Sequence, residues 1–266
     1  MRTVAAVLAG GSGRRFGAGA RKQLLTVGGT TVIERSVAAF EDAPGVDEII
    51  VVVPPGMTRE IAALLAGAGF RKVSRVVEGG ATRPDSAQQA IRAVSAAGRA
   101  DGPAVVDSPD GSAGPDGPDG PDGPDGPDGG DGPDDDCCLL LHDAARPLVD
   151  QTIIAACLAA LREHQAVGVT IPSSDTVVTV EDGVITHVPS RDKIHRCQTP
   201  QGFRLPVIRR AYELAAADPG FTATDDCGVV LRYLPAVPVA VVPGSARNIK
   251  ITYPGDIEIA EILLKN

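Results

Sequence analysis

Basic side chains follow a glycine-rich turn near the start of the chain. Residues 8–17 read LAGGSGRRFG, and Lys22 stands five positions further on. Backbone N–H groups of such a turn can approach phosphate oxygens, and neighbouring Arg and Lys side chains supply the positive charge that phosphoryl transfer requires. The segment therefore fits a nucleotidyltransferase loop, in which a glycine-rich turn is followed by Arg and then Lys.

Three other glycine-rich templates fail at single positions. A dinucleotide-binding fingerprint needs its third glycine where Phe16 stands. A Walker loop needs Ser or Thr after its lysine, whereas Gln23 follows Lys22. A nucleophile elbow around Ser12 needs Gly where Arg14 stands. A dehydrogenase, a P-loop enzyme and an α/β-hydrolase are therefore disfavoured.

Two further segments could supply ligands. Residues 141–147 read LHDAARP and follow a predicted buried strand, at the edge where open α/β sheets bind ligands. The carboxylate of Asp143 could hold Mg²⁺ on the phosphates of a nucleotide, whereas we interpret His142 as structural because no nucleophile accompanies it. Residues 248–252 read NIKIT, and a lone lysine such as Lys250 beside apolar residues is usually a surface side chain.

The elements that must position these residues alternate between strand and helix. Continuous apolar runs predict strands, and amphipathic segments predict helices between them. Such alternation predicts one α/β domain over residues 1–266, with a mostly parallel sheet and helices on both faces. The predicted strands span 3–8, 49–53, 72–77, 137–141, 167–171 and 237–242, and the predicted helices span 31–40, 59–68, 84–97, 150–164, 206–217 and 254–264.

A hairpin interrupts the alternation. Residues 176–180 and 184–188 are Val-rich, and the turn between them contains Asp182 and Gly183, a pair typical of tight β-turns. A lone two-stranded ribbon is only marginally stable in water, so its apolar side chains need cover. We therefore predict that residues 175–200 form a projecting β-arm that packs on a second subunit.

The overall net charge conceals two parts of the chain that differ in composition. The chain of 266 residues has a net charge of −9, but residues 101–136 contain twelve Asp and no basic residue. The other 230 residues hold 22 acidic and 25 basic side chains, a net charge of +3. Because five Gly-Pro-Asp triplets at 114–128 offer almost no apolar surface, we predict that 101–136 is a disordered insertion, most simply a solubilising loop at the sheet edge opposite the ligands.

Composition also excludes several classes of protein. An acidic chain lacks the clustered Lys and Arg of nucleic-acid binding, and no apolar run is long enough to span a membrane. The five cysteines are odd in number and lack C-x-x-C spacing, and the four histidines show no metal-binding spacing. We therefore expect a cytoplasmic protein that binds neither nucleic acid nor membrane.

Taken together and in order, the motifs resemble the 2-C-methyl-D-erythritol 4-phosphate cytidylyltransferases of the non-mevalonate isoprenoid pathway. The resemblance covers nearly all of the chain except 101–136. The residues that carry it are Ala9–Arg15, Lys22-Gln23, Gly79-Gly80, Arg83, Asp85-Ser86, His142–Pro147, Asp175-Thr176, Arg191, Gln198–Gln201, Thr224–Asp226 and Asn248–Thr252.

The resemblance implies a Rossmann-like nucleotidyltransferase domain, a homodimer joined by the arm, and transfer of CMP from CTP to a small sugar-alcohol phosphate. It implies that Arg15, Lys22 and Lys250 stabilise charge on the α-phosphate, and that Asp143 serves Mg²⁺ or another divalent cation. The residues implied to hold CTP are Ala9, Gly10, Gly11, Gly13, Gly80, Arg83 and Ser86. Those implied for the sugar-alcohol phosphate are Asp143, Arg146, Thr176, Arg191, Thr199, Thr224 and Asp225, with Thr176 and Arg191 acting across the dimer.

The chain departs from the usual pattern of this family at a few positions. Arg21 and Leu24 stand where Pro and an aromatic residue are usual, and Ala81 stands where Asp or Glu is common. Two alternatives stay open at this point. One is a cytidylyltransferase acting on ribitol 5-phosphate, and the other is a catalytically silent nucleotide-binding subunit.

Overall fold

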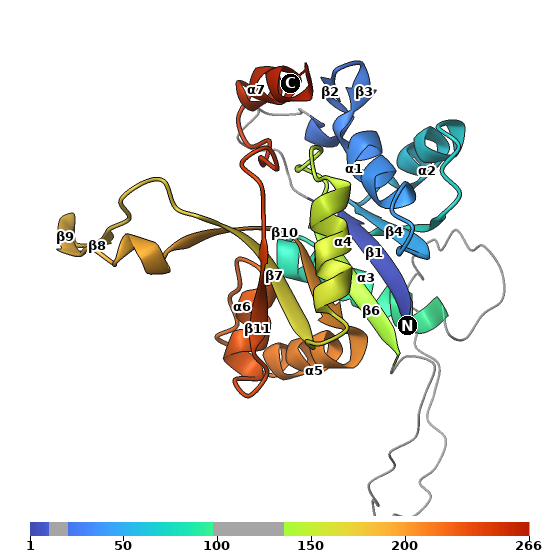
Figure 1. Cartoon of the computed structure of the whole chain (residues 1–266). Helices are drawn as coiled ribbons and strands as arrows, with labels where there is room; N and C mark the ends of the chain where they lie inside the picture. The colour runs from blue at the N-terminus through green and yellow to red at the C-terminus, as the bar shows by residue number, and fades with distance from the viewer. Residues whose placement is uncertain (11–20, 98–135, 266) are drawn as a thin grey trace, which may run out of the picture.

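A seven-stranded sheet forms the centre of the molecule (Figure 1). The computed structural model describes residues 1–10, 21–97 and 136–265. The sheet strands are β1 (Arg2–Leu8), β4 (Glu48–Val53), β5 (Val73–Glu78), β6 (Cys137–Asp143), β7 (Ala166–Pro172), β10 (His195–Arg204) and β11 (Val239–Pro243). Their spatial order is β11-β7-β10-β6-β1-β4-β5, and the pairs that exclude β10 are parallel.

Two neighbouring strands end together at the carboxyl edge of the sheet. In the parallel pairing of β1 with β6, Leu8 lies opposite Asp143. The backbone N–H of Ala9 then donates to Val52 O at 2.7 Å, and that of Ala144 donates to Leu8 O at 2.9 Å. The start of the glycine-rich turn is therefore held beside Asp143.

Helices cover both faces of the sheet, as predicted. On one face α1 (Val32–Glu41), α2 (Thr58–Gly67) and α4 (Gln151–Ala160) share a core with alternate residues of β1 and β4. On the other face α3 (Arg83–Ala97), α5 (Leu205–Ala216) and α6 (Asp226–Tyr233) share a core with the intervening residues. Helix α1 begins with a capping box, in which Thr31 Oγ1 accepts from the Glu34 N–H and Glu34 accepts from the Thr31 N–H.

Several elements differ from the sequence expectations. Strand β10 was not predicted, and it runs antiparallel to both β6 and β7. Helix α6 was also not predicted, and the helix expected over 150–164 ends at Ala160. A short hairpin of β2 (Thr26–Val27) and β3 (Thr30–Thr31) packs with the closing helix α7 (Asp256–Lys265).

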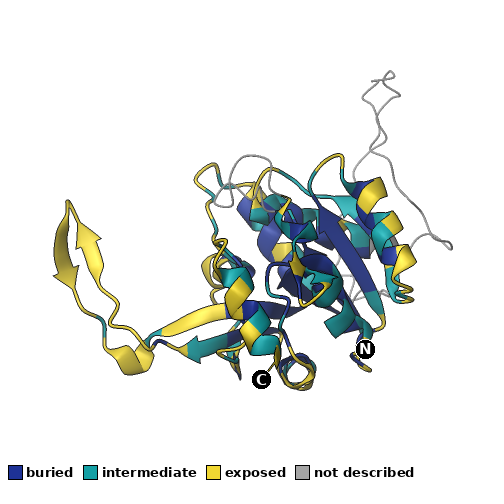
Figure 2. Cartoon of the chain, turned by 90° about the horizontal axis from the view of Figure 1, so that it is seen from above, coloured by how far each residue is buried: buried dark blue, intermediate teal, exposed yellow. Residues whose placement is uncertain are grey.

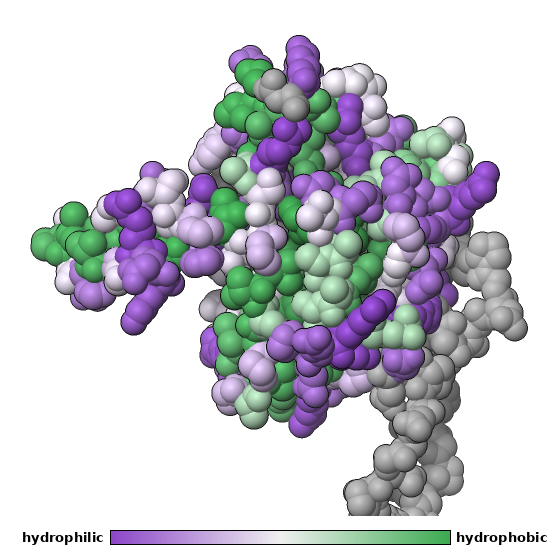
Figure 3. All heavy atoms as spheres, viewed as in Figure 1, coloured by the Kyte–Doolittle hydropathy of each residue, from purple (hydrophilic) through white to green (hydrophobic). Residues whose placement is uncertain are grey.

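The hairpin after β7 projects from the body of the molecule (Figures 1 and 2). It consists of β8 (Thr179–Glu181) and β9 (Val184–His187), and its turn residues Asp182 and Gly183 have φ angles of 49° and 79°. Figure 3 shows hydrophobic side chains gathered at its tip. The exposed fractions of Val184 and Ile185 are 64% and 61%, so these apolar side chains have no cover within the described part of the chain.

The segment predicted as an insertion lies outside the described residues except for Asp136. This residue directly precedes β6, at the opposite end of the strand from Asp143. Its carboxylate pairs with the N-terminal amine of Met1 at 2.9 Å and with Arg204 Nη1 at 3.6 Å. Within the residues described, no helix is both long and apolar enough to cross a membrane.

We expect removal of residues 101–135 to leave catalysis intact. Asp136 should be kept because of its ion pairs, and a short Gly-Ser linker should join the two flanks. Since the segment joins the fold at the amino end of β6, kcat/KM should stay within about twofold of the full chain. A large loss of kcat/KM in a variant with an unchanged thermal transition would contradict this expectation.

Candidate active site

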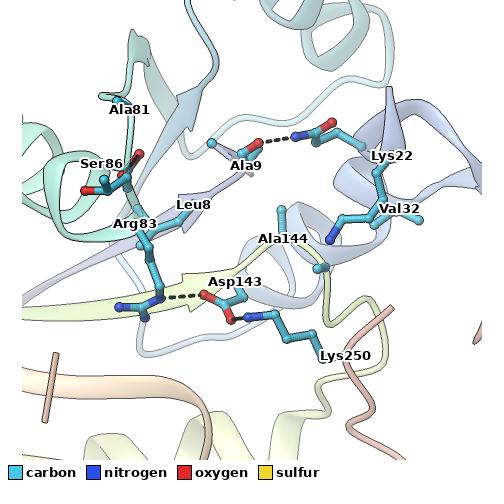
Figure 4. A pocket seen from close by; sticks show the side chains of 14 residues that line it. Leu8, Ala9, Lys22, Val32, Ala81, Arg83, Ser86, Asp143, Ala144 and Lys250 are labelled. Atoms are coloured by element: carbon cyan, nitrogen blue, oxygen red, sulfur yellow. Dashed lines mark hydrogen bonds and ion pairs between the residues drawn. The ribbon is translucent and has the colours of Figure 1, made fainter. Parts of the chain in front are cut away.

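A cavity opens at the carboxyl ends of β1 and β6 (Figure 4). Six separate segments contribute to its wall, which places a ligand where parallel α/β sheets usually bind one. The lining residues are Leu8, Ala9, Gly10, Lys22, Gln23, Val32, Ala81, Thr82, Arg83, Ser86, Asp143, Ala144, Ala145 and Lys250. Of the predicted CTP residues, Ala9, Gly10, Arg83 and Ser86 lie in this wall.

The segment after the glycine-rich turn is fixed by side-chain contacts. Lys22 and Gln23 lie in the one-turn helix η2 (Lys22–Leu24). The Gln23 amide donates to Ala9 O, and Lys22 Nζ donates to Ile251 O at 3.0 Å. These bonds hold Lys22 at the cavity, next to the segment that carries Lys250.

Close backbone approach explains two of the glycines. A Cβ added to Gly10 would lie 2.5 Å from Ser86 Oγ, and one added to Gly80 would lie 2.2 Å from Asp85 Cβ. Glycine therefore fits best at these two positions, where the chain after β1 and the chain after β5 approach the start of α3. Ala81, rather than Gly80, faces the cavity.

Asp143 joins two cationic side chains from distant parts of the chain. Arg83 Nε donates to Asp143 Oδ1 at 3.0 Å, and Lys250 Nζ donates to Asp143 Oδ2 at 2.7 Å. Burial alone would raise the pKa of this carboxyl, but the charges of Arg83 and Lys250 outweigh burial and hold the pKa well below its usual range. Asp143 is therefore ionised, and Lys250, although its side chain is 43% exposed, lines the cavity and pairs with Asp143.

A second carboxylate shares the guanidinium of Arg83. Arg83 Nη2 lies 2.8 Å from Asp226 Oδ2, and Asp226 is completely buried in the first turn of α6. The hydroxyl of Tyr212 donates to Asp226 Oδ1 at 2.7 Å. Burial together with Asp226 raises the pKa of Tyr212, so this hydroxyl keeps its proton. Neither Tyr212 nor Asp226 was predicted as a site residue, since only the folded chain brings them to Arg83.

The backbone of Asp143 is held by a buried polar chain. Its N–H donates to Thr199 Oγ1 at 3.0 Å, and that hydroxyl lies 3.1 Å from His142 Nδ1. His142 Nε2 lies 3.2 Å from Arg146 O. Burial lowers the pKa of His142 to about 4, so the ring is neutral at pH 7. The complete burial of His142 agrees with its interpretation as a structural residue, and the Thr199 hydroxyl holds the backbone of Asp143.

A neighbouring cavity shares Lys250 with the first. Its wall contains Arg146, Ile171, Arg196, Cys197, Gln198, Ala246, Asn248, Ile249 and Lys250. Arg146 Nη1 donates to Asn248 O at 2.8 Å and Nη2 donates to Cys197 O at 3.2 Å, which fixes the guanidinium in the wall. The side chains of Arg146, Arg196 and Lys250 give this cavity a positive lining.

Other predicted site residues lie elsewhere. Thr176 and Arg191 belong to the projecting hairpin and its base, where Arg191 Nη2 donates to Thr176 Oγ1 at 3.0 Å. Thr224 is exposed before α6, and Asp225 caps that helix by accepting from the Gly228 N–H at 3.0 Å. None of these four lines either cavity within this chain. Arg15, Gly11 and Gly13 lie outside the described residues.

The donor set at the cavity fits only one kind of metal site. The described residues contain no cluster of three or more His, Cys, Asp or Glu that could enclose an ion. Among the described residues that line the cavity, Asp143 is the one that offers carboxylate oxygens. Such a site suits Mg²⁺, which usually keeps several waters and binds through one or two carboxylates plus substrate phosphates.

Comparison with known proteins identifies the family. The sequence model of the 2-C-methyl-D-erythritol 4-phosphate cytidylyltransferase family matches residues 3–101 and 132–266 of this chain. The chain belongs to this family. The unmatched residues 102–131 fall inside the segment that composition marks as an insertion, so the cytidylyltransferase sequence continues on both sides of it.

Individual cytidylyltransferases agree with this assignment. The protein of that name from Thermobifida fusca is 48% identical over 99% of this chain and 94% of its own length. The crystal structure of 4-diphosphocytidyl-2C-methyl-D-erythritol synthase from Anaerococcus prevotii has a TM-score of 0.73 at 26% identity, covering 100% of this chain and 99% of that one. A bifunctional ribulose 5-phosphate reductase/CDP-ribitol pyrophosphorylase from Haemophilus influenzae is 33% identical over 100% of this chain but 48% of its own length.

We expect His142 to make this cytidylyltransferase less stable in mild acid. Because the folded-state pKa of about 4 lies below the ordinary 6.5, the unfolded chain takes up the proton first as the pH falls. Stability should therefore decline between these two values by up to about 3 kcal/mol. Urea unfolding at a series of pH values would measure the decline.

The control for this experiment is His142→Gln. Gln cannot take up a proton in this window, so the free energy of unfolding of the variant should fall less steeply than that of the wild type between pH 6.5 and 4.5. The Asp143 carboxyl contributes only at lower pH, because its folded-state pKa lies below its ordinary value. If the free energy of unfolding falls equally with pH in the two proteins, His142 takes up its proton in the folded state as readily as in the unfolded chain.

Proposed function

We propose that the chain transfers CMP from CTP to 2-C-methyl-D-erythritol 4-phosphate, giving 4-diphosphocytidyl-2-C-methyl-D-erythritol and pyrophosphate. The observation that carries the proposal is the convergence of Lys22, Arg83, Asp143 and Lys250 on one cavity at the carboxyl edge of the sheet. Family membership supports the choice of reaction.

In this reaction a phosphate oxygen of the acceptor attacks the α-phosphorus of CTP in line. The new P–O bond forms as the bond to the bridging oxygen of the β-phosphate breaks, and that oxygen leaves as part of pyrophosphate. The attacking group is already an anion, so no covalent enzyme intermediate is needed. Positioning and positive charge therefore carry catalysis, and Lys22 and Lys250 can supply that charge.

The two cavities fit the two substrates. The first combines backbone approach at Gly10 with Ser86 and Lys22, which suits a nucleotide, and the second presents Arg146 and Arg196, which suits a phosphorylated acceptor. Lys250 lies in the wall of both cavities. It is therefore placed to contact the attacking phosphate and the α-phosphate together, where negative charge accumulates during transfer.

A divalent cation completes the nucleotide site in this proposal. Asp143 would contribute one carboxylate to Mg²⁺, and the remaining ligands would come from CTP and water. When bound, the cation offsets the charge of the triphosphate. The contacts from Arg83 and Lys250 fix the direction in which Asp143 presents its oxygens.

Release of pyrophosphate from CTP tests the proposal directly. The purified chain should release pyrophosphate with methylerythritol phosphate, and more slowly or not at all with ribitol 5-phosphate. Ribitol 5-phosphate is the alternative acceptor to test, because the Haemophilus relative is named as a CDP-ribitol pyrophosphorylase. Faster release with ribitol phosphate would favour that alternative, and release with neither acceptor would favour a catalytically silent nucleotide-binding subunit.

We expect Lys22→Ala and Lys250→Ala each to lower kcat by roughly two to three orders of magnitude. Each variant removes one cationic contact to the transferring phosphoryl group, a loss of the size measured for single transition-state contacts. Steady-state kinetics and a thermal melt of each variant would check this.

Lys72→Ala is the matched control for these lysine variants. Lys72 Nζ also donates to a backbone carbonyl, Ala43 O at 2.7 Å, but at the other edge of the sheet. Its kcat should stay near that of the wild type. Wild-type turnover in Lys22→Ala or Lys250→Ala would exclude that lysine from the transfer step.

We also infer that the hairpin joins two copies of the chain. The apolar side chains of Val180, Val184 and Ile185 are more than half exposed, and a second subunit is a natural source of cover. Thr176 and Arg191, which line neither cavity of their own chain, would then approach the cavities of the partner.

We expect the double variant Val184→Asp/Ile185→Asp to be monomeric. Two charges on the exposed strand oppose burial of that strand in any interface. The KM for the sugar phosphate should rise about tenfold or more if the partner's hairpin completes the acceptor cavity. Light scattering together with kinetics would measure both effects. A monomeric wild type would contradict the inference. The double variant Thr179→Asp/Thr186→Asp adds the same two charges to the hairpin without removing apolar side chains, so its oligomeric state shows whether added charge alone separates the subunits.

A further inference from the structure

A buried tyrosine and a buried aspartate stand behind the guanidinium of Arg83. Tyr212 lies on α5 and is 4% exposed, and Asp226, the first residue of α6, is completely buried. The Tyr212 hydroxyl donates to Asp226 Oδ1 at 2.7 Å, and Asp226 Oδ2 lies 2.8 Å from Arg83 Nη2. Neither residue is among the described ones that line the two cavities. The pair therefore reaches the nucleotide cavity through Arg83.

Packing does not account for a carboxylate at this position. Tyr212 and the α6 residues Val229 and Val230 belong to the apolar core on this face of the sheet. The attraction within a buried ion pair rarely exceeds the loss of hydration, and apolar side chains of similar size often stabilise such a core at least as well. The pairing of Asp226 with Arg83 therefore needs a reason other than stability.

Asp226 is the fixed member of this pair. Its backbone N–H donates to Gln201 Oε1 at 2.9 Å, and Gln201 belongs to the central strand β10. With Tyr212 on one carboxylate oxygen, Asp226 is held from both β10 and α5. The Arg83 side chain is 20% exposed and lies in the cavity wall, so it is the member whose direction can change.

Arg83 divides one guanidinium between two carboxylates. Its Nε donates to Asp143 Oδ1 at 3.0 Å (Figure 4), while Nη2 lies 2.8 Å from Asp226 Oδ2. An arginine beside a single carboxylate favours two parallel hydrogen bonds to it. Without Asp226, the guanidinium would be free to turn further onto Asp143, which already pairs with Lys250 through its other oxygen. Less of the charge of Arg83 and of Asp143 would then face the cavity.

Resting on the proposed function, we propose that Asp226, held by Tyr212, is a positioning residue for the binding of CTP. It acts on the nucleotide through Arg83 and does not touch it. By holding one nitrogen of Arg83, it keeps the guanidinium in the cavity wall, where CTP would meet both Arg83 and Asp143. Tyr212 takes part because its hydroxyl fixes the oxygen of Asp226 that does not face Arg83.

Binding of CTP to the full chain tests this role. Calorimetric titration with CTP and Mg²⁺, without an acceptor, should give a Kd about tenfold higher for Asp226→Asn than for the wild type, because a charge-assisted contact to Arg83 is lost. Tyr212→Phe removes only a hydroxyl and should raise the Kd about threefold. The double variant should bind CTP no more weakly than Asp226→Asn, because the two residues act as one unit. If Asp226→Asn is unfolded by circular dichroism, Tyr212→Phe carries the test.

Kinetics separate positioning from general support of the fold. Arg83 lines the nucleotide cavity but is not among the residues that line the cavity containing Arg146. In Asp226→Asn the KM for CTP should therefore rise about tenfold, while the KM for the sugar phosphate stays within about twofold. A loss of folded enzyme would instead lower kcat and leave both KM values unchanged.

Asp218→Asn is the matched control. Asp218 Oδ2 also accepts from a tyrosine and an arginine, since the Tyr233 hydroxyl and Arg232 Nη2 each donate to it at 2.6 Å. This group is more exposed, with 29% of the Asp218 side chain accessible, and it lines neither cavity. The Kd of Asp218→Asn for CTP should match that of the wild type.

Three outcomes would overturn the positioning role. They are an unchanged Kd for CTP in the folded variants, an equal rise in both KM values, and a lower kcat with both KM values unchanged. Absence of pyrophosphate release with both sugar phosphates would count against the proposed function alone, because the Kd for CTP needs no acceptor. A wild type that binds no CTP would overturn both.

Discussion

The carboxylate of Asp143, held between Arg83 and Lys250, is the interaction on which the rest of the site depends. A charge at 8% exposure is costly unless it is paired, and here each oxygen has a cationic partner. Removing either partner would leave a buried charge incompletely compensated, which costs far more than a surface ion pair contributes. The pairs therefore fix the start of α3 and the segment after β11 against the ends of β1 and β6.

A second layer of contacts makes that arrangement rigid. The guanidinium of Arg83 cannot turn freely, because Asp226 holds its far side and Tyr212 holds Asp226. On the opposite side, the buried Asn248 side chain donates to Thr199 O at 2.9 Å and so ties the segment that carries Lys250 to β10. Positioning catalysis requires this kind of support, because small displacements of charged groups lower the rate steeply.

The sequence predicts the parallel part of the fold well and the polar connections poorly. A buried parallel strand is an uninterrupted apolar run, so 3–8 and 137–141 identify β1 and β6 directly. Strand β10 shows no such run, since Gln198, Thr199 and Gln201 serve buried hydrogen bonds instead of the apolar core. The Asp143–Lys250 pair spans 107 positions, and no local pattern can encode it. Resemblance to a family, rather than spacing, therefore had to point to Lys250.

Acidic and basic residues lie at opposite ends of strand β6. The acidic segment joins the fold at Asp136, one residue before β6, while the side chains of Lys22, Arg83 and Lys250 gather where β6 ends at Asp143. A seven-residue strand separates these points by about 20 Å, more than two Debye lengths at physiological salt. Where the segment joins the fold, its charge is thus largely screened from the anionic substrates. The described carboxylate of that segment, Asp136, therefore lies at the opposite end of β6 from the cavity, and the net charge of −9 does not contradict a site for phosphates.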